Sequence, residues 1–327
     1  MRNAKNIKYR TRRLNLFSKK YEYTLNQYIK IKKIEEMTGK KIWELFDCIV
    51  GTSTGGIIAA GVTVTKNGKT PHLDLETLYK LYTEEGSVIF PQPKNKFQKI
   101  FKDINSVFNP KYSPEGLDKL LTQYFGDLTL KNTLKPIIVT SYDLKSNQII
   151  MFKTRNAQWH DERFNVKLKD VCRATSAAPT YLPSYEMKFD GKDRVLVDGG
   201  VYINNPVLAA VSDVIKNCDI KLSDIECLSI GTGIHSESLG VKTEGWGLIN
   251  WVKPITTIMM QASSMSVDYQ SDQLLKKHLR LQIKIEDQSK TDMADSRPET
   301  TQYLVDKVKK EIFDDVKLMK KLQRFFK

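Results

Sequence analysis

The chain has 327 residues, of which 40% are apolar, and a formal net charge of +14 at pH 7. This length and apolar share support a real core, either as one large domain or as a domain with appendages. The cysteines lie far apart, without a C-x-x-C pair or a histidine at metal-ligand spacing, which excludes a recognisable zinc site or disulfide framework and favours a reducing compartment. They are Cys48, Cys172, Cys218 and Cys227.

The positive charge is concentrated at the beginning of the chain. Residues 1–33 hold eleven Lys or Arg and the single acid Glu22, which leaves a net charge of only +4 for the rest. No RNA- or DNA-binding motif accompanies these charges, so nucleic acid is not an expected partner. No signal-peptide or membrane-spanning segment is recognisable, which predicts a cytoplasmic or peripheral membrane location, with secretion by a non-Sec route as the alternative.

The first strong motif is G-T-S-T-G-G at residues 51–56. The apolar run before it predicts a buried strand, and the run 57–62 after it predicts a buried helix. Ser53 therefore lies at a sharp strand-to-helix turn, and Gly51 and Gly55 let the chain turn there without a Cβ clash. This arrangement presents the serine hydroxyl as a nucleophile, although a loop that merely turns the chain is the alternative.

The elements that follow alternate between helices and strands, which predicts an α/β layered domain without internal repeats. Residues 85–112 have no regular pattern and form a candidate lid or membrane-facing flap, with an ordinary surface loop as the alternative. Helices are predicted at residues 74–84, 113–126, 168–177 and 206–217, hairpins at residues 136–152 and 185–197, and a buried strand at residues 227–230.

A second candidate site residue stands at the end of the run R-V-L-V-D-G-G, residues 194–200. A buried strand here delivers the carboxylate of Asp198 at its end, where open α/β sheets place their sites. Gly199 and Gly200 allow a tight turn against a neighbouring segment. The bland alternative is a simple Asp-Gly turn.

A serine nucleophile needs a base, and the chain contains four histidines. His72 is expected in a loop, His160 in a charged surface stretch and His278 in a Lys-rich helix. Only His235, after the G-T-G turn at residues 231–233, is expected near a strand end. A triad of Ser53, Asp198 and His235, as in the α/β-hydrolases, is therefore one alternative.

Residues from about Lys33 to Ile285 resemble the patatin-like phospholipases, whose pattern pairs a G-x-S-x-G serine with an aspartate in a D-G-G or D-G-A motif. Further blocks that carry the resemblance are L-F-D at 45–47, A-T-S-A-A-P-T-Y at 174–181, N-N-P at 204–206 and L-S-I-G-T-G at 228–233. The resemblance implies a three-layer α/β/α fold with a mostly parallel central sheet. It also implies a Ser53-Asp198 dyad that hydrolyses acyl esters of glycerophospholipids or other lipids, as a phospholipase A.

In the mechanism implied by this resemblance, Asp198 takes the proton of Ser53 as the hydroxyl attacks the ester carbonyl. The resulting acyl-enzyme is hydrolysed by water. The Thr54 N–H is one oxyanion donor, and the scheme needs no metal and no other cofactor. The expected partners are an acyl-ester lipid substrate and a peripheral membrane surface.

The chain departs from the family before residue 33. The family's other oxyanion donors lie in a glycine-rich loop after the first strand, but this sequence has no glycine before Gly39 and no buried strand pattern there. We therefore expect residues 1–32 to be an atypical basic segment, disordered or translated in a shifted frame, with a genuine divergent segment as the alternative. Impaired catalysis follows, and a remnant that binds lipid or a partner is the second functional hypothesis.

The remaining chain divides into a hydrolase domain at residues 33–290 and an amphipathic basic helix at residues 291–327. Apolar residues recur at helical spacing from Leu304 to Leu322, with lysines on the other face. Such a helix could rest on an anionic membrane. Packing of its apolar face against the domain is the favoured interpretation.

Overall fold

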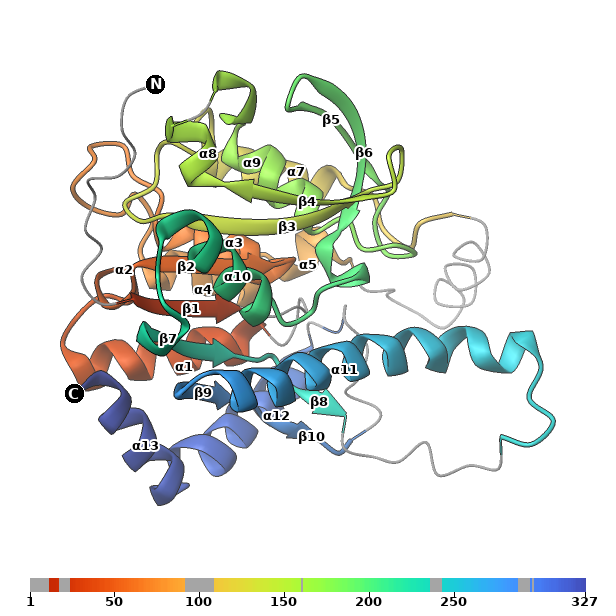
Figure 1. Cartoon of the computed structure of the whole chain (residues 1–327). Coiled ribbons are helices and arrows are strands. Elements are labelled where there is room, and N and C mark those ends of the chain that lie inside the picture. Colours follow the sequence, from red (N-terminus) through yellow and green to blue (C-terminus); the bar gives the residue numbers. More distant parts are fainter. Residues whose placement is uncertain are drawn as a thin grey trace.

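The structure, a computed structural model, describes residues 12–17, 24–91, 109–159, 161–235, 243–287, 295 and 297–327. An eight-stranded sheet forms the centre, in the order β5-β6-β3-β2-β1-β7-β9, with β4 paired to β3 (Figure 1). Its strands are β1 (Arg12–Phe17), β2 (Cys48–Thr52), β3 (Ile137–Asp143), β4 (Gln148–Lys153), β5 (Tyr185–Phe189), β6 (Lys192–Asp198), β7 (Ile225–Ile230) and β9 (Lys277–Leu281). A separate short pair consists of β8 (Ile234–His235) and β10 (Lys284–Ile285).

The sheet is mixed but mostly parallel, as the sequence predicted. The pairs β1-β2, β1-β7, β2-β3 and β7-β9 are parallel, and the antiparallel pairs are β3-β4, β3-β6 and β5-β6. Both predicted hairpins are confirmed. The second turns at Asp190 and Gly191, whose φ values of 51° and 69° suit the tight turn that an Asp-Gly pair favours.

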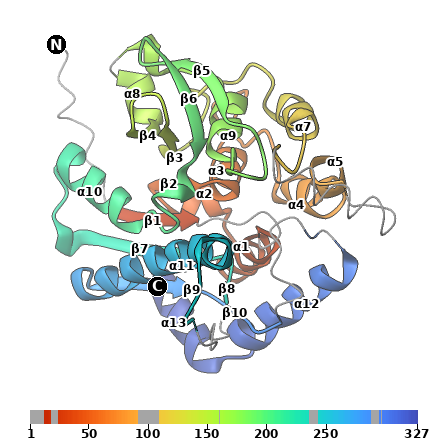
Figure 2. The ribbon, with the colours of Figure 1, turned by 90° about the vertical axis from the view of Figure 1, so that its right-hand side faces the viewer.

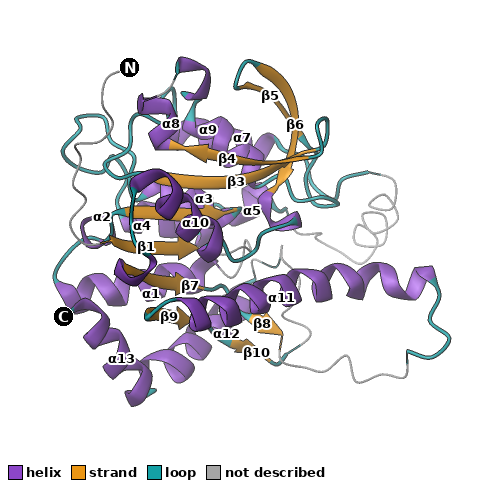
Figure 3. Ribbon diagram, in the orientation of Figure 1, coloured by secondary structure: helices purple, strands orange, loops and turns teal. Residues whose placement is uncertain are grey.

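Helices cover both faces of the sheet, which gives the three layers that the sequence predicted (Figures 2 and 3). The helices are α1 (Thr24–Thr38), α2 (Ile42–Leu45), α3 (Thr54–Gly61), α4 (Leu75–Thr83), α5 (Gly86–Ile89), α7 (Glu115–Phe125), α8 (Thr154–Trp159), α9 (Leu168–Thr175), α10 (Val207–Cys218), α11 (Leu248–Leu274), α12 (Pro298–Val308) and α13 (Val316–Phe326). Figure 2 shows α3, α7 and α9 on one side of the sheet and α10 on the other.

Alternating residues of the central strands supply the two cores. In β2, Ile49 belongs to the core beneath α3, whereas Val50 belongs to the core beneath α10. In β3, Ile137 and Val139 face the first core and Ile138 faces the second. Because side chains of a strand alternate between faces, a nearly continuous apolar run is what a sheet covered on both sides requires.

The expectation that no strand precedes residue 33 is wrong. Residues Arg12–Phe17 form β1, which lies between β2 and β7 and pairs in parallel with both. The pattern R-R-L-N-L-F is short and begins with two charges, so it lacks the apolar run by which the other central strands are recognised. The segment 18–23, which joins β1 to α1, lies outside the described residues, as does residue 11 and everything before it.

From Thr24 onward the basic segment forms a helix with many buried residues. Helix α1 spans Thr24–Thr38, so the boundary proposed after residue 32 falls inside one helix. Lys30 is fully buried, and its ammonium donates to the carbonyls of Gly231 at 2.8 Å and Leu281 at 3.4 Å. Burial lowers the pKa of this ammonium. The Lys30 side chain thus links α1 to the ends of β7 and β9 by hydrogen bonds.

The predicted carboxy-terminal helix is two helices, α12 and α13, separated by a π-helical turn at Lys309–Phe313. Its apolar face packs on the domain as expected, because Leu304, Val308 and Leu322 are at most 1% exposed. Of the predicted flap at residues 85–112, residues 92–108 lie outside the described part. Among the described helices, none combines the length and hydropathy needed to cross a bilayer.

Candidate active site

Ser53 lies at the junction of β2 and α3 in a strained conformation. Its φ and ψ are 58° and −127°, a region that non-glycine residues avoid and that costs about 1–3 kcal/mol. The turn is so tight that a Cβ on Gly51 would stand 2.1 Å from the Gly55 carbonyl oxygen. Glycine at position 51 is therefore a steric requirement, as the sequence motif predicted.

A buried threonine holds the backbone of the nucleophile candidate. The Ser53 N–H donates to Thr175 Oγ1 at 2.8 Å, and the Thr175 hydroxyl donates to the Thr140 carbonyl at 2.6 Å. Thr175 thus links the turn to β3. Thr175 lies in the block 174–181 that carries the family resemblance, but its contact with Ser53 could not be predicted, because a hydrogen bond between residues 53 and 175 has no signature in local sequence pattern.

The structure brings Ser53 and Asp198 into direct contact. The Ser53 hydroxyl donates to Asp198 Oδ2 at 2.6 Å, while Asp198 Oδ1 accepts the Gly200 N–H at 2.7 Å. Ser53 is 5% exposed and Asp198 is fully buried. Both carboxylate oxygens therefore have a donor, and one of these donors is the hydroxyl whose proton a nucleophilic attack would release.

The sheet topology explains how residues 145 positions apart meet. Strand β3 separates β2 from β6, and Ser141 of β3 is paired with Asp198. Gly199 then passes so close to β3 that a Cβ there would be 2.2 Å from the Thr140 hydroxyl oxygen. The absence of a side chain at Gly199 lets the Asp198 turn approach the strand beside the Ser53 turn.

A buried ion pair fixes the strand that carries Asp198. Arg194 of β6 donates to Asp143 of β3 at 2.9 Å, and their side chains are 6% and 1% exposed. Burial would raise the pKa of Asp143, but hydrogen bonds from Ser146, Arg194 and the Val195 N–H outweigh it and lower the pKa. The pair ties the end of β3 to β6, two residues along β3 from the Ser141–Asp198 pair.

The positive end of α3 points at this site. The carbonyl of Ser53 already accepts the N–H groups of Gly56 at 2.8 Å and Ile57 at 3.3 Å. The helix begins at Thr54, so the N–H groups of Thr54 and Gly55 belong to the first turn, where the helix dipole favours negative charge. The Gly200 N–H, in contrast, serves the Asp198 carboxylate.

The direct Ser53-Asp198 contact speaks against the histidine triad. In a triad the imidazole stands between serine and carboxylate, and a separation of 2.6 Å leaves no space for a ring. The backbone of His235 lies in β8, and its side chain is outside the described part. His278 lies in strand β9 rather than in the expected helix, and it contacts Asp272 at 2.6 Å. Burial lowers the pKa of His72 in its loop. His160 is not among the described residues.

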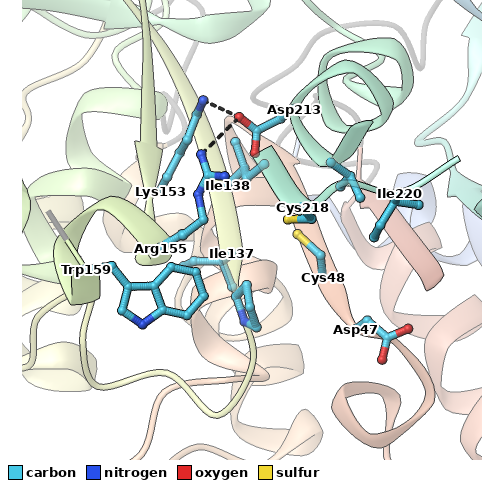
Figure 4. A pocket seen from close by; sticks show the side chains of 12 residues that line it. Asp47, Cys48, Ile137, Ile138, Lys153, Arg155, Trp159, Asp213, Cys218 and Ile220 are labelled. Atoms are coloured by element: carbon cyan, nitrogen blue, oxygen red, sulfur yellow. Dashed lines mark hydrogen bonds and ion pairs between the residues drawn. The ribbon is translucent and has the colours of Figure 1, made fainter. Parts of the chain in front are cut away.

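A cavity of about 50 Å³ lies at the opposite end of the same strands (Figure 4). Asp47 and Cys48 line it at the beginning of β2, with Trp159 at one side and Cys218 at the other. The cavity therefore does not serve Ser53. Within the described residues, no cluster of three or more His, Cys, Asp or Glu could hold a metal ion.

The comparisons with known proteins agree with the resemblance seen in the motifs. A family model described as patatin-like phospholipase matches residues 31–211, which include Ser53 and Asp198. Patatin-like protein 2 of Arabidopsis thaliana is 32% identical over 263 residues, which cover 72% of this chain and 64% of that protein. Patatin-like protein 2 of Oryza sativa subsp. indica is 32% identical over 285 residues, which cover 77% and 70%.

This chain therefore spans less than two thirds of the length of the Arabidopsis relative. Among solved structures, the crystal structure of VipD from Legionella pneumophila aligns with 96% of this chain and 67% of that chain. Its TM-score is 0.46 and its sequence identity is 12%, values too low to bear on function.

Proposed function

Since this chain belongs to the patatin-like phospholipase family, we propose that it is a lipid acyl hydrolase that uses Ser53 as nucleophile and Asp198 as base. The observation that carries the proposal is the 2.6 Å hydrogen bond from the Ser53 hydroxyl to Asp198 Oδ2 at a strained turn. A serine that already donates to a buried carboxylate has an acceptor in place for its proton.

The proposed reaction has two steps. The Ser53 oxygen attacks the acyl carbonyl as its proton passes to Asp198, which then gives the proton to the leaving alcohol, and an acyl-enzyme forms. Water attacks this ester as Asp198 again takes a proton, which returns to Ser53 when the fatty acid leaves. The Thr54 N–H at the positive end of α3 stabilises the oxyanion in both steps.

The proposed substrate is the ester of a glycerophospholipid, cleaved as by a phospholipase A, and the proposed location is the cytoplasm or a peripheral membrane surface. The family assignment favours an acyl-ester lipid over other esters. No cofactor enters the scheme, because the proton acceptor and the nucleophile are both side chains of this chain.

A purified-protein assay tests the proposal. The protein is incubated with phosphatidylcholine in mixed micelles and the release of free fatty acid is followed. We expect Ser53→Ala and Asp198→Asn each to reduce turnover by at least about 10⁴-fold. The matched control Asp127→Asn, an exposed carboxylate paired with Lys167, should keep the wild-type rate. Equal turnover in wild type and both site variants would refute the dyad.

A second candidate function is a catalytically impaired, lipid-binding protein. The segment 18–23, which joins β1 to α1, reads S-K-K-Y-E-Y and contains no glycine, whereas the family has its glycine-rich oxyanion loop after the first strand. Loss of one oxyanion donor costs about 10²- to 10³-fold in rate. Binding of the micelles without Ser53-dependent turnover would favour this candidate.

A further inference from the structure

Helix α11 carries large apolar side chains on its solvent-exposed face. Leu248, Ile255 and Met259 are 81%, 43% and 63% exposed. Their spacings of seven and four residues place them on one face of the helix. Together they form a stripe, named here the α11 stripe, along the amino-terminal half of a helix that runs from Leu248 to Leu274.

The opposite face of α11, which packs on the domain, is mixed: it carries buried serines beside the apolar Val267, which packs against the second core. Ser264 is 9% exposed and Ser271 is fully buried. The side-chain amide of Asn204 donates to the Met260 carbonyl at 3.0 Å, and that of Asn205 donates to the Ser264 carbonyl at 3.5 Å. A surface helix ordinarily exposes polar side chains, so the α11 stripe calls for an apolar partner beyond the residues that the structure describes.

The stripe lies at the end of the sheet that carries Ser53. Asn204 and Asn205, which hold α11, follow closely after Asp198 in the chain. Figure 1 shows the amino-terminal half of α11 projecting past the carboxyl ends of β1, β2 and β7, the end at which Ser53 follows β2. The stripe and Ser53 therefore lie toward the same end of the sheet.

The composition of this helix half favours a lipid surface over a protein. Residues 248–267 contain a single charged residue, Lys253, and the first acid of the helix is Asp268. Trp246 and Trp251 stack edge to face at its beginning, with ring centroids 5.1 Å apart. Tryptophan is enriched where membrane meets water. In addition, the helix lies outside residues 31–211, the part matched by the family model.

From these observations we infer that residues 248–260 of α11 lie on the surface of a lipid bilayer. Leu248, Ile255 and Met259 enter the boundary between head groups and acyl chains, as in other interfacial helices. The contact holds the Ser53 end of the sheet against aggregated lipid. This role in substrate access rests on the proposed function, but the binding itself does not require catalysis.

The binding test compares two triple variants in a Ser53→Ala background, so that no lipid is consumed. One replaces Leu248, Ile255 and Met259 by Ser, and the other replaces three exposed apolar residues elsewhere. That matched control changes Leu144, Ile149 and Val316, which are 48%, 54% and 64% exposed. In co-sedimentation with phosphatidylcholine/phosphatidylglycerol vesicles, we expect the stripe variant to bind at least about tenfold more weakly and the control to bind like the parent.

An activity test follows with Ser53 intact. We expect the stripe variant to reduce the ratio of vesicle hydrolysis to hydrolysis of a soluble short-chain ester by at least about tenfold. Absence of Ser53-dependent turnover on either substrate would refute the proposed function and leave the binding result standing. Equal vesicle binding by both triple variants would overturn the inference. So would loss of a dimer in analytical ultracentrifugation with vesicle binding unchanged, because the stripe would then be a protein contact.

Discussion

The two ends of strand β2 differ in almost every physical respect. At the carboxyl end, Ser53 has a strained backbone and is hydrogen-bonded through both its N–H and its hydroxyl. The turn around it leaves no room for a Cβ at Gly51. At the amino end, Cys48 lines an apolar cavity beside an ion pair of Lys153 and Asp213, and burial raises the pKa of its thiol. The cavity is at the end without the proposed nucleophile.

This difference teaches that strand direction locates the candidate site better than the presence of a cavity. In a parallel sheet the strand ends that lead into helices gather polar turns and helix dipoles at one edge. The amino ends of the strands follow loops, and the only requirement on them is that they are buried by neighbouring residues. If the comparison is right, substitutions at the carboxyl end should change activity, and substitutions at the amino end should change stability alone.

The largest difference in activity is expected between substitutions at Ser53 and Cys48, at the two ends of β2. Ser53→Ala should abolish labelling by a fluorophosphonate probe and lower ester turnover by at least about 10⁴-fold, because the nucleophile is lost. Cys48→Ala, at the other end of β2, should keep turnover within about twofold. Labelling of Ser53→Ala at the wild-type rate would break the comparison.

Gly51→Ala should be the next most damaging change. The new Cβ would meet the Gly55 carbonyl at 2.1 Å, so the turn must open and Ser53 must move. We expect a loss of about 3 kcal/mol in the free energy of unfolding and at least about 100-fold in activity. Urea unfolding and initial rates measure both. Gly247→Ala, where a Cβ meets nothing within 4 Å, is the control.

The buried pair beside the site predicts a pH-dependent stability. Asp143→Asn leaves Arg194 without its carboxylate and should cost about 3 kcal/mol at pH 7. Because the pKa of Asp143 is lowered in the folded protein, this contribution is present above the unfolded pKa of about 3.9 and is lost as the pH falls through the folded pKa. Urea unfolding should show that the difference in unfolding free energy between wild type and Asp143→Asn becomes smaller from pH 7 to pH 3. A constant difference would contradict this assignment to Asp143.

Thr175→Val tests how the Ser53 backbone is held. Removing the hydroxyl leaves the Ser53 N–H and the Thr140 carbonyl without this partner, at a cost of about 1–3 kcal/mol. We expect activity to fall about tenfold, since the nucleophile loses a positioning contact. Thr175→Ser keeps the hydroxyl and should recover most of both. Failure of the serine variant to do so would assign the effect to packing.

The smallest effect is expected at the amino end. Asp213→Asn removes the carboxylate that pairs with Lys153 at 2.5 Å and lies 3.7 Å from Arg155. We expect a loss of about 1 kcal/mol in unfolding free energy and an unchanged kcat/KM. A drop in kcat/KM of tenfold or more, with the fold intact by circular dichroism, would show that the two ends are coupled.

The contact between Ser53 and Asp198 could be expected from the sequence because each residue lies at a turn with a local signature. The turn at Ser53 and the D-G-G turn at Asp198 are each marked by glycines next to an apolar strand. The predicted helices and hairpins between them appear within a few residues of their expected bounds, for the same reason: each has its own period and its own turn residues.

The parts that were missed depend on partners distant in sequence. Strand β1 has little apolar pattern and is defined by pairing with β2 and β7 on either side. Lys30 is buried only because carbonyls at the ends of β7 and β9 accept its protons. The break between α12 and α13 likewise has no glycine or proline to announce it.

The place of β1 in the sheet has a mechanical consequence. On one side of this strand lie β2, β3 and β6, which lead to Ser53 and Asp198, and on the other lie β7 and β9, the second of which contacts α11. Strand β1 thus joins the part of the sheet that leads to the proposed chemistry to the part that contacts α11 through β9, and Asn204 and Asn205 form a second link to this helix. Weakening the pairing of β1 with its neighbours would let the two parts of the sheet shift. A protein bound to lipid through α11 could then hold Ser53 at the wrong distance from the bilayer surface.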